Sequence, residues 1–168
     1  KQYYLDIDPS SGVDDGKHHE AGLLVTEVGT GDLCAEWGGH LAPYTLGVMA
    51  GGLSRQYNEA GIDIEMKDHW GVNVVRGVNA ARMGHRLAHE LRELSPGKWA
   101  KEVGFDMNEE VKSLVIGCEQ EWIAAWGVGH KYAKCPSRRL ITQMLDAELD
   151  ERGKVVAGPG IAHGWGMI

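Results

Sequence analysis

Residues 61–71 read GIDIEMKDHWG, and this stretch decides the fold that the sequence predicts. Two isoleucines alternate with two acids, Asp63 and Glu65, before a polar turn that ends at a glycine. Alternate side chains of a β-strand project from the same face, so the pattern predicts a strand with both carboxylates on one side. Carboxylates on a short strand between two helical segments are costly unless they bind something positive. We therefore expect this strand to bind a cation.

A second acidic strand opens the chain. Residues 3–8 read YYLDID and are followed by Pro9. Proline cannot donate to a β-ladder, so we expect the strand to stop at Asp8. Open α/β sheets place their ligands at the carboxyl ends of their strands. We expect the two acidic strands to lie side by side, with Asp8 and Glu65 sharing metal ions at their tips.

The other elements are predicted from hydrophobic periodicity and turn signals. An antiparallel meander comes first, and helices and strands alternate after it, which implies a mixed sheet flanked by helices in an α/β fold. We expect one domain that spans residues 1–168. The expected strands lie at residues 20–28, 33–37, 62–66 and 98–105, and the expected helices at residues 43–58, 70–94, 111–126 and 137–149, the last capped by Ser137.

The composition is that of an ordinary globular protein, with 43% hydrophobic and 24% charged residues. No apolar run approaches the roughly 18 residues needed to cross a bilayer, and no signal peptide precedes the first strand, so we expect no membrane association. Three cysteines without CxxC spacing favour a reducing compartment over a disulfide framework or a zinc cluster. The net charge of −7 is unlike that of most nucleic-acid binders, but bound divalent metals would reverse its sign locally.

Three stretches in combination resemble the nuclease domain of a tailed-bacteriophage large terminase subunit, which belongs to the RNase H-like superfamily. The first is YLDIDPS at residues 4–10, and the second is GTGD at residues 29–32, followed by Glu36-Trp37. The third is YNEA at residues 57–60, which runs into the acidic strand and its Gly-ended turn. The likeness covers about the first half of the chain, and the segment from residue 151 to His163 is a weaker echo of the family's last motif.

The resemblance implies an RNase H-like endonuclease that cuts concatemeric viral DNA during genome packaging with two divalent ions, Mg²⁺ or Mn²⁺. By position, Asp8 matches the family's first metal-binding acid, Glu65 matches the second, and His163 lies near the third motif. The family's third acid follows a His near the C-terminus, whereas no acid occurs here after Glu151. Either that acid was substituted, or it lies outside this sequence, or another residue replaces it. The nearby candidates are Asp6, Asp14, Asp15 and Asp63.

The resemblance also implies partners. They are double-stranded DNA, the packaging ATPase domain, the small terminase subunit and the portal, in the cytoplasm of an infected bacterium. The sequence has no Gly-rich phosphate loop of the P-loop type, so we expect the ATPase domain to be absent from it. One basic cluster is a candidate phosphate-contacting rim and equally a solvated face. It consists of Lys131, Lys134, Arg138 and Arg139.

Less specific interpretations of the site remain open. Asp8 also suits a turn before Pro9, Glu65 suits an exposed edge strand, and His163 suits a solvated tail. Two other functions are therefore kept as hypotheses. One is a junction-resolving nuclease of the same fold, which would prefer branched DNA. The other is a catalytically impaired RNase H-like module that binds DNA or a partner. Nothing in the sequence resembles a base-reading helix or finger, so cutting is expected to be largely independent of DNA sequence.

Overall fold

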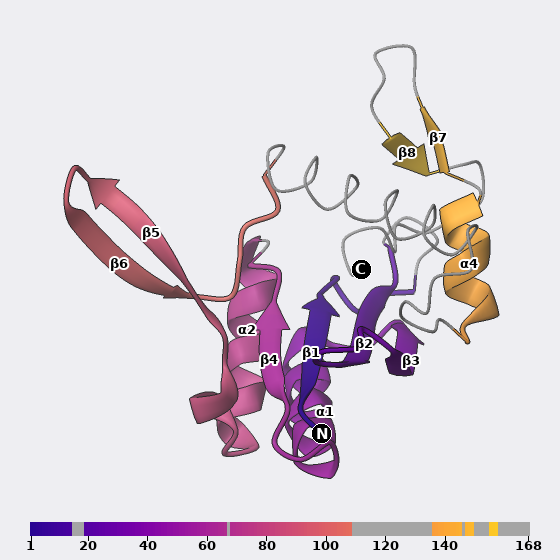
Figure 1. Ribbon diagram of the computed structural model, residues 1–168, viewed down its shortest axis with the longest axis horizontal. Helices are drawn as coiled ribbons and strands as arrows, with labels where there is room; N and C mark the ends of the chain where they lie inside the picture. The colour runs from indigo at the N-terminus through magenta and orange to yellow at the C-terminus, as the bar shows by residue number, and fades with distance from the viewer. Residues whose placement is uncertain (15–18, 67, 109–135, 146, 150–154, 158–168) are drawn as a thin grey trace.

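The computed structural model describes residues 1–14, 19–66, 68–108, 136–145, 147–149 and 155–157 (Figure 1). It is an α/β fold built on a mixed four-stranded sheet with the order β3-β2-β1-β4. Strands β1, β2 and β3 form an antiparallel meander, and β4 lies parallel to β1. The predicted mixed sheet is confirmed. The strands are β1 (Tyr3–Asp8), β2 (Ala21–Glu27), β3 (Leu33–Gly39) and β4 (Gly61–Ile64).

Apolar and acidic residues alternate along β1 and β4 because only one face of the sheet packs against the core. Leu5 pairs with Ile62 and Ile7 pairs with Ile64, and all four side chains are at most 1% exposed. A register slip of one residue would turn these side chains toward the opposite face, so their burial specifies the pairing. The acids between them consequently share the other face of the sheet, which we call the outer face.

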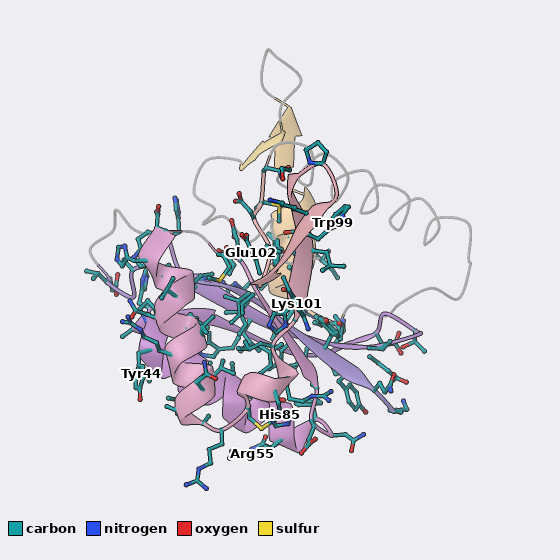
Figure 2. All side chains as sticks on the ribbon, turned by 90° about the vertical axis from the view of Figure 1, so that its left-hand side faces the viewer. Tyr44, Arg55, His85, Trp99, Lys101 and Glu102 are labelled. Atoms are coloured by element: carbon teal, nitrogen blue, oxygen red, sulfur yellow. The ribbon has the colours of Figure 1, made fainter. Side chains whose placement is uncertain are left out.

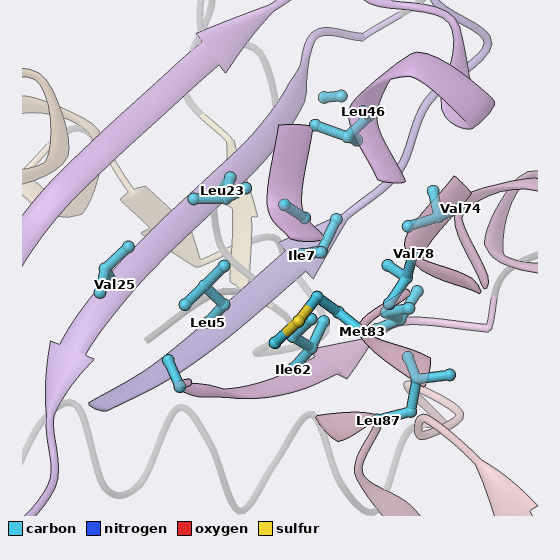
Figure 3. Close-up of a cluster of buried hydrophobic side chains, with 14 residues drawn as sticks. Leu5, Ile7, Leu23, Val25, Leu46, Ile62, Val74, Val78, Met83 and Leu87 are labelled. Carbon is cyan, nitrogen blue, oxygen red and sulfur yellow. The ribbon is translucent and has the colours of Figure 1, made fainter. Parts of the chain in front are cut away.

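Two helices cover the buried face of the sheet (Figure 1). They are α1 (Pro43–Gln56) and α2 (Asp68–Ala80), and proline at the first helical position suits the start of α1. Leu46 of α1 and Val74 of α2 are fully buried in the same cluster as the strand residues (Figure 3). The main core therefore lies between the sheet and these two helices.

Glycines form the contact between α1 and α2. A Cβ on Gly47 would meet the carbonyl oxygen of Val74, and one on Gly77 would meet the carbonyl oxygen of Tyr44. The two backbones approach so closely that a side chain at either position would push the helices apart. The predicted helix at residues 43–58 is confirmed.

Residues 70–94 do not form the single helix that the sequence predicts, so that prediction is wrong. Helix α2 ends earlier, a 3₁₀ turn η1 (Gly84–Arg86) follows, and β5 (His89–Ser95) is a strand. The apolar spacing that suggested a helix has a different origin. Leu87 is buried beside strand β4, whereas Leu91 lies on β5 and is 66% exposed.

Strand β5 pairs with β6 (Lys98–Val103) in an antiparallel hairpin that extends away from the sheet (Figure 1). The strand predicted at residues 98–105 is thereby confirmed. The hairpin interrupts the chain that runs beside β4. Ala88 N–H donates to Ile62 O at 2.7 Å before the hairpin, and Phe105 N–H donates to Ile64 O at 3.0 Å after it. The edge of the sheet beyond β4 is therefore formed by two short parallel segments.

The last described helix is α4 (Arg138–Leu145). Leu140 N–H donates to Ser137 Oγ at 3.0 Å, which confirms the predicted cap. The helix is shorter than predicted, because β7 (Ala147–Leu149) is a strand that pairs with β8 (Val155–Ala157). The helix predicted at residues 111–126 lies outside the described residues. Within the described part of the chain, no helix is both long enough and apolar enough to cross a bilayer.

Candidate metal centre

Asp8 and Glu65 lie side by side at one edge of the sheet. Asp8 ends β1, and Glu65 directly follows β4. Ile7 and Ile64 are the last parallel pair before them, and Glu65 N–H donates to Ile7 O at 3.0 Å. Neighbouring strands are about 4.8 Å apart, and residues at matching positions project from the same face. The fold therefore brings the two acids predicted to bind metal onto adjacent positions of the outer face.

A second pair of acids lies one step back on the same face, where Asp6 pairs with Asp63. Burial, and then the Asp63 carboxylate, raise the pKa of Asp6 to about 7. Burial also raises the pKa of Asp63, although its Oδ1 accepts a 3.0 Å hydrogen bond from Ile64 N–H that lowers the pKa. Negative charge is consequently crowded along this part of the outer face. We call Asp6, Asp8, Asp63 and Glu65 the acidic edge.

The amino end of the acidic edge is flanked by Tyr4 and Arg86. Burial raises the pKa of the Tyr4 hydroxyl, the Asp63 and Asp6 carboxylates raise it further, and Arg86 lowers it. The Arg86 Nε atom is buried and has no hydrogen-bond partner among the described residues. Arg86 therefore lies near enough to Tyr4 to influence its hydroxyl.

Asp14 and Asp15, the remaining candidates for the third acid, follow β1 in the sequence. Asp14 is exposed, and its Oδ1 lies 3.7 Å from Nε2 of His40, which follows β3. Across the residues that the structure describes, no group of three or more His, Cys, Asp or Glu side chains is placed to hold a metal ion. Asp15, His163, Lys131 and Lys134 lie outside the described residues.

Carboxylate oxygens are hard ligands and suit Mg²⁺ or Mn²⁺. Mg²⁺ keeps several waters and is commonly bound through one or two protein carboxylates together with substrate phosphates. Two carboxylates at adjacent strand ends therefore fit such an ion even without a complete protein cage. A cation there would also lower the pKa of Asp6, which burial and then the Asp63 carboxylate raise.

The structure shows one contact on the outer face that the sequence did not predict. Arg139 of α4 donates from Nη2 to Glu20 Oε2 at 2.8 Å, although the two residues are 119 positions apart. The guanidinium also lies against Gly38, where a Cβ would overlap it. Arg139 had been named only as part of a basic cluster. A glycine pair at the end of β3 was the single local signal that something packs there.

Comparison of the chain with protein-family models, with curated proteins and with solved structures finds no match. Function is therefore inferred from the geometry of the acidic edge and from the sequence motifs.

Proposed function

We propose that the chain is a metal-dependent endonuclease that hydrolyses DNA phosphodiester bonds. One observation carries the proposal: Asp8 and Glu65 occupy adjacent positions at the carboxyl ends of two parallel strands, on the outer face. The order β3-β2-β1-β4, with a parallel edge added by the segments around Ala88 and Phe105, supports an RNase H-like fold. The motif resemblance to a tailed-bacteriophage terminase nuclease points to viral concatemers as the DNA that is cut.

In this proposal, the carboxylates of Asp8 and Glu65 hold the divalent ions. A pair of bound Mg²⁺ or Mn²⁺ ions supplies an activated water and stabilises the leaving oxygen in phosphodiester hydrolysis. The protein fixes the separation of the two carboxylates through the β1–β4 ladder. Behind them, burial and the Asp63 carboxylate raise the pKa of Asp6 to about 7.

The family that the sequence resembles has a third metal-binding acid, and this acid has no counterpart among the described residues. Water and the substrate phosphate would fill the coordination positions that Asp8 and Glu65 leave open. Asp6 and Asp63 are the acids nearest in register to the strand tips. His163 stays a candidate through the motif alone, because it lies outside the described residues.

Plasmid cleavage tests the proposal. With Mn²⁺ or Mg²⁺, the wild-type chain should nick and then linearise supercoiled plasmid. Asp8→Asn and Glu65→Gln should each lower the rate roughly 100-fold or more, because each removes a charged metal ligand. Asp14→Asn is the matched control, since it removes an equal charge from an exposed loop. Absence of cutting by the wild-type chain across a range of metal concentrations would overturn the enzyme proposal.

A catalytically impaired DNA-binding module is the second candidate function. It is favoured by the lack, in the described part of the chain, of any group of three or more metal-ligating side chains. Such a module would bind duplex DNA but leave plasmid intact. A junction-resolving nuclease would instead cut branched DNA faster than linear duplex. By the same resemblance, we propose the packaging ATPase domain, the small terminase subunit and the portal as partners in the host cytoplasm.

A further inference from the structure

The row of the outer face that contains Asp8 continues across β2 and β3 through glycines. Asp8 pairs with Gly22, and Gly22 pairs with Gly38. Residues directly opposite each other in antiparallel strands share a face, so all three positions belong to the outer face. The guanidinium of Arg139 lies on this face against Gly38. Two strand spacings, about 10 Å, separate the backbone at Gly38 from that at Asp8.

The guanidinium is held in place from two sides. Its Nη2 group donates to Glu20 Oε2 at 2.8 Å, and its Nη1 group lies over the Cα of Gly38. The next residue, Leu140, is only 6% exposed and anchors the helix that carries the arginine. Arginine has five N–H donors, and this side chain is still 42% exposed. Donors therefore remain available to an anion that approaches from solvent.

The charge of the whole chain makes such a cation important. The net charge is −7, and DNA is a polyanion, so the chain needs fixed positive groups where the DNA backbone passes. A planar guanidinium matches the geometry of a phosphate and binds it through two parallel hydrogen bonds. The distance of about 10 Å from the Asp8 backbone leaves room for a metal ion and the phosphate it holds.

We propose that Arg139 binds a DNA backbone phosphate beside the phosphate held at Asp8 and Glu65. Gly38 is part of this subsite, because a side chain there would displace the guanidinium. The inference rests on the proposed function, since it assigns a second contact for the same DNA substrate.

Four variants test the subsite by fluorescence anisotropy with a short fluorescein-labelled DNA duplex. Ca²⁺ replaces Mg²⁺ in this assay, because its looser coordination geometry disfavours the reaction. Arg139→Gln should weaken binding about tenfold, the cost of a lost charge-assisted hydrogen bond. It should also lower the slope of log K against log salt concentration by about 0.9, the value for one phosphate contact. Arg138→Gln removes an equal charge from the exposed neighbouring position. It should weaken DNA binding much less than Arg139→Gln does.

Glu20→Gln separates phosphate binding from a role in holding α4 on the sheet. An ion pair between two exposed side chains stabilises a protein little, so the fold should survive its loss. Removal of the competing carboxylate should leave DNA binding unchanged or make it tighter. Equal weakening in Glu20→Gln and Arg139→Gln, with an unchanged salt slope, would overturn the proposal. Equal weakening in Arg138→Gln and Arg139→Gln would also overturn it, because diffuse charge would then explain the binding.

Arg139→Lys keeps the charge but loses the planar fork. It should restore most of the salt slope while recovering only part of the affinity. Thermal melting of each variant establishes that it is folded. A wild-type chain that neither binds nor cuts DNA would contradict the proposed function and this inference together. A wild-type chain that binds and cuts DNA, with Arg139→Gln behaving identically, would contradict this inference alone.

Discussion

The carboxyl of Asp6 titrates near neutral pH, because burial and the Asp63 carboxylate raise its pKa from 3.8 to about 7. Between these pKa values, the unfolded chain is ionised at this position and the folded chain is protonated. The folded state binds more protons there, so the free energy of unfolding falls as the pH rises from about 4 to about 7. Above that range the penalty is complete, at up to roughly 4 kcal/mol.

Asp6→Asn should therefore stabilise the protein most at alkaline pH. At pH 8 the variant should exceed wild type by roughly 1–3 kcal/mol, because the asparagine never ionises. At pH 5 the difference should be smaller. Urea denaturation at the two pH values measures both quantities, with Asp14→Asn as the exposed control. A stability difference that did not change with pH would show that the pKa of Asp6 is not raised in the folded protein.

The tips of the acidic strands could be predicted at the level of residues, whereas the arginine subsite could not. Asp8 and Glu65 are each marked by local signals, a strand ended by proline and a strand ended by a polar turn. Their adjacency then needs only one parallel pairing. The contact between Arg139 and Glu20 joins residues 119 positions apart. No sequence pattern around either residue predicts that the two are in contact.

At the scale of elements, the glycine contact between α1 and α2 sets how closely the helices pack on the sheet. Gly47→Ala should destabilise the protein by about 2–4 kcal/mol, because the new methyl would meet the Val74 backbone. Gly52→Ala in the same helix has open space and should gain up to about 1 kcal/mol. Urea denaturation of both variants measures the contrast. Similar values for the two variants would mean that the helices can separate without cost.

Two large apolar side chains of the β5–β6 hairpin, Leu91 and Trp99, are exposed. Trp99 on β6 is 61% exposed and is drawn on the projecting hairpin in Figure 2. Replacement of residues 90–102 by a short Gly-rich turn should leave the sheet folded, with a melting temperature within about 5 °C of wild type. Circular dichroism and thermal melting measure this outcome.

Gly104→Ala is the informative control for the hairpin deletion. Gly104 has a φ of 71°, and a Cβ there would meet the carbonyl oxygen of Ile64. This single methyl should destabilise the protein more than removal of the whole hairpin, since it strains the segment that joins β4. The opposite order would show that the hairpin itself supports the edge of the sheet.

The predicted helix at residues 70–94 failed for a physical reason. The chain turns after α2 at Arg82, a non-glycine residue with a φ of 60°, and the nearest glycine, Gly84, comes two residues later. The turn accompanies burial of Met83, at 2% exposure, and of Leu87 in the core. Those contacts involve strands that are distant in the sequence. The periodicity of a local segment carries no information about such contacts. By contrast, β1 and β4 carry their own alternation, and both were predicted.

At the scale of the whole molecule, a net charge of −7 and the acidic edge should couple folding stability to divalent metal. Mn²⁺ should raise the melting temperature of wild type, with a gain of about 2.7 kcal/mol at one hundred times the dissociation constant. EDTA should reverse the gain. Differential scanning fluorimetry measures the shift.

Asp8→Asn and Glu65→Gln should each lose most of this metal-dependent shift, whereas Asp14→Asn should keep it. A full shift in both strand-tip variants would place the bound metal elsewhere on the molecule. Since this readout needs no DNA, it tests the metal site separately from cleavage.

The split edge beyond β4 offers an attachment point within the chain. The main chain leaves the sheet at Ala88 and returns at Gly104, and these two residues are joined by a hydrogen bond of 3.0 Å. The segment between these two residues can therefore be replaced by another sequence. A peptide tag or a reporter protein could be inserted at the hairpin tip, between Pro96 and Gly97. The hairpin would hold it away from the sheet.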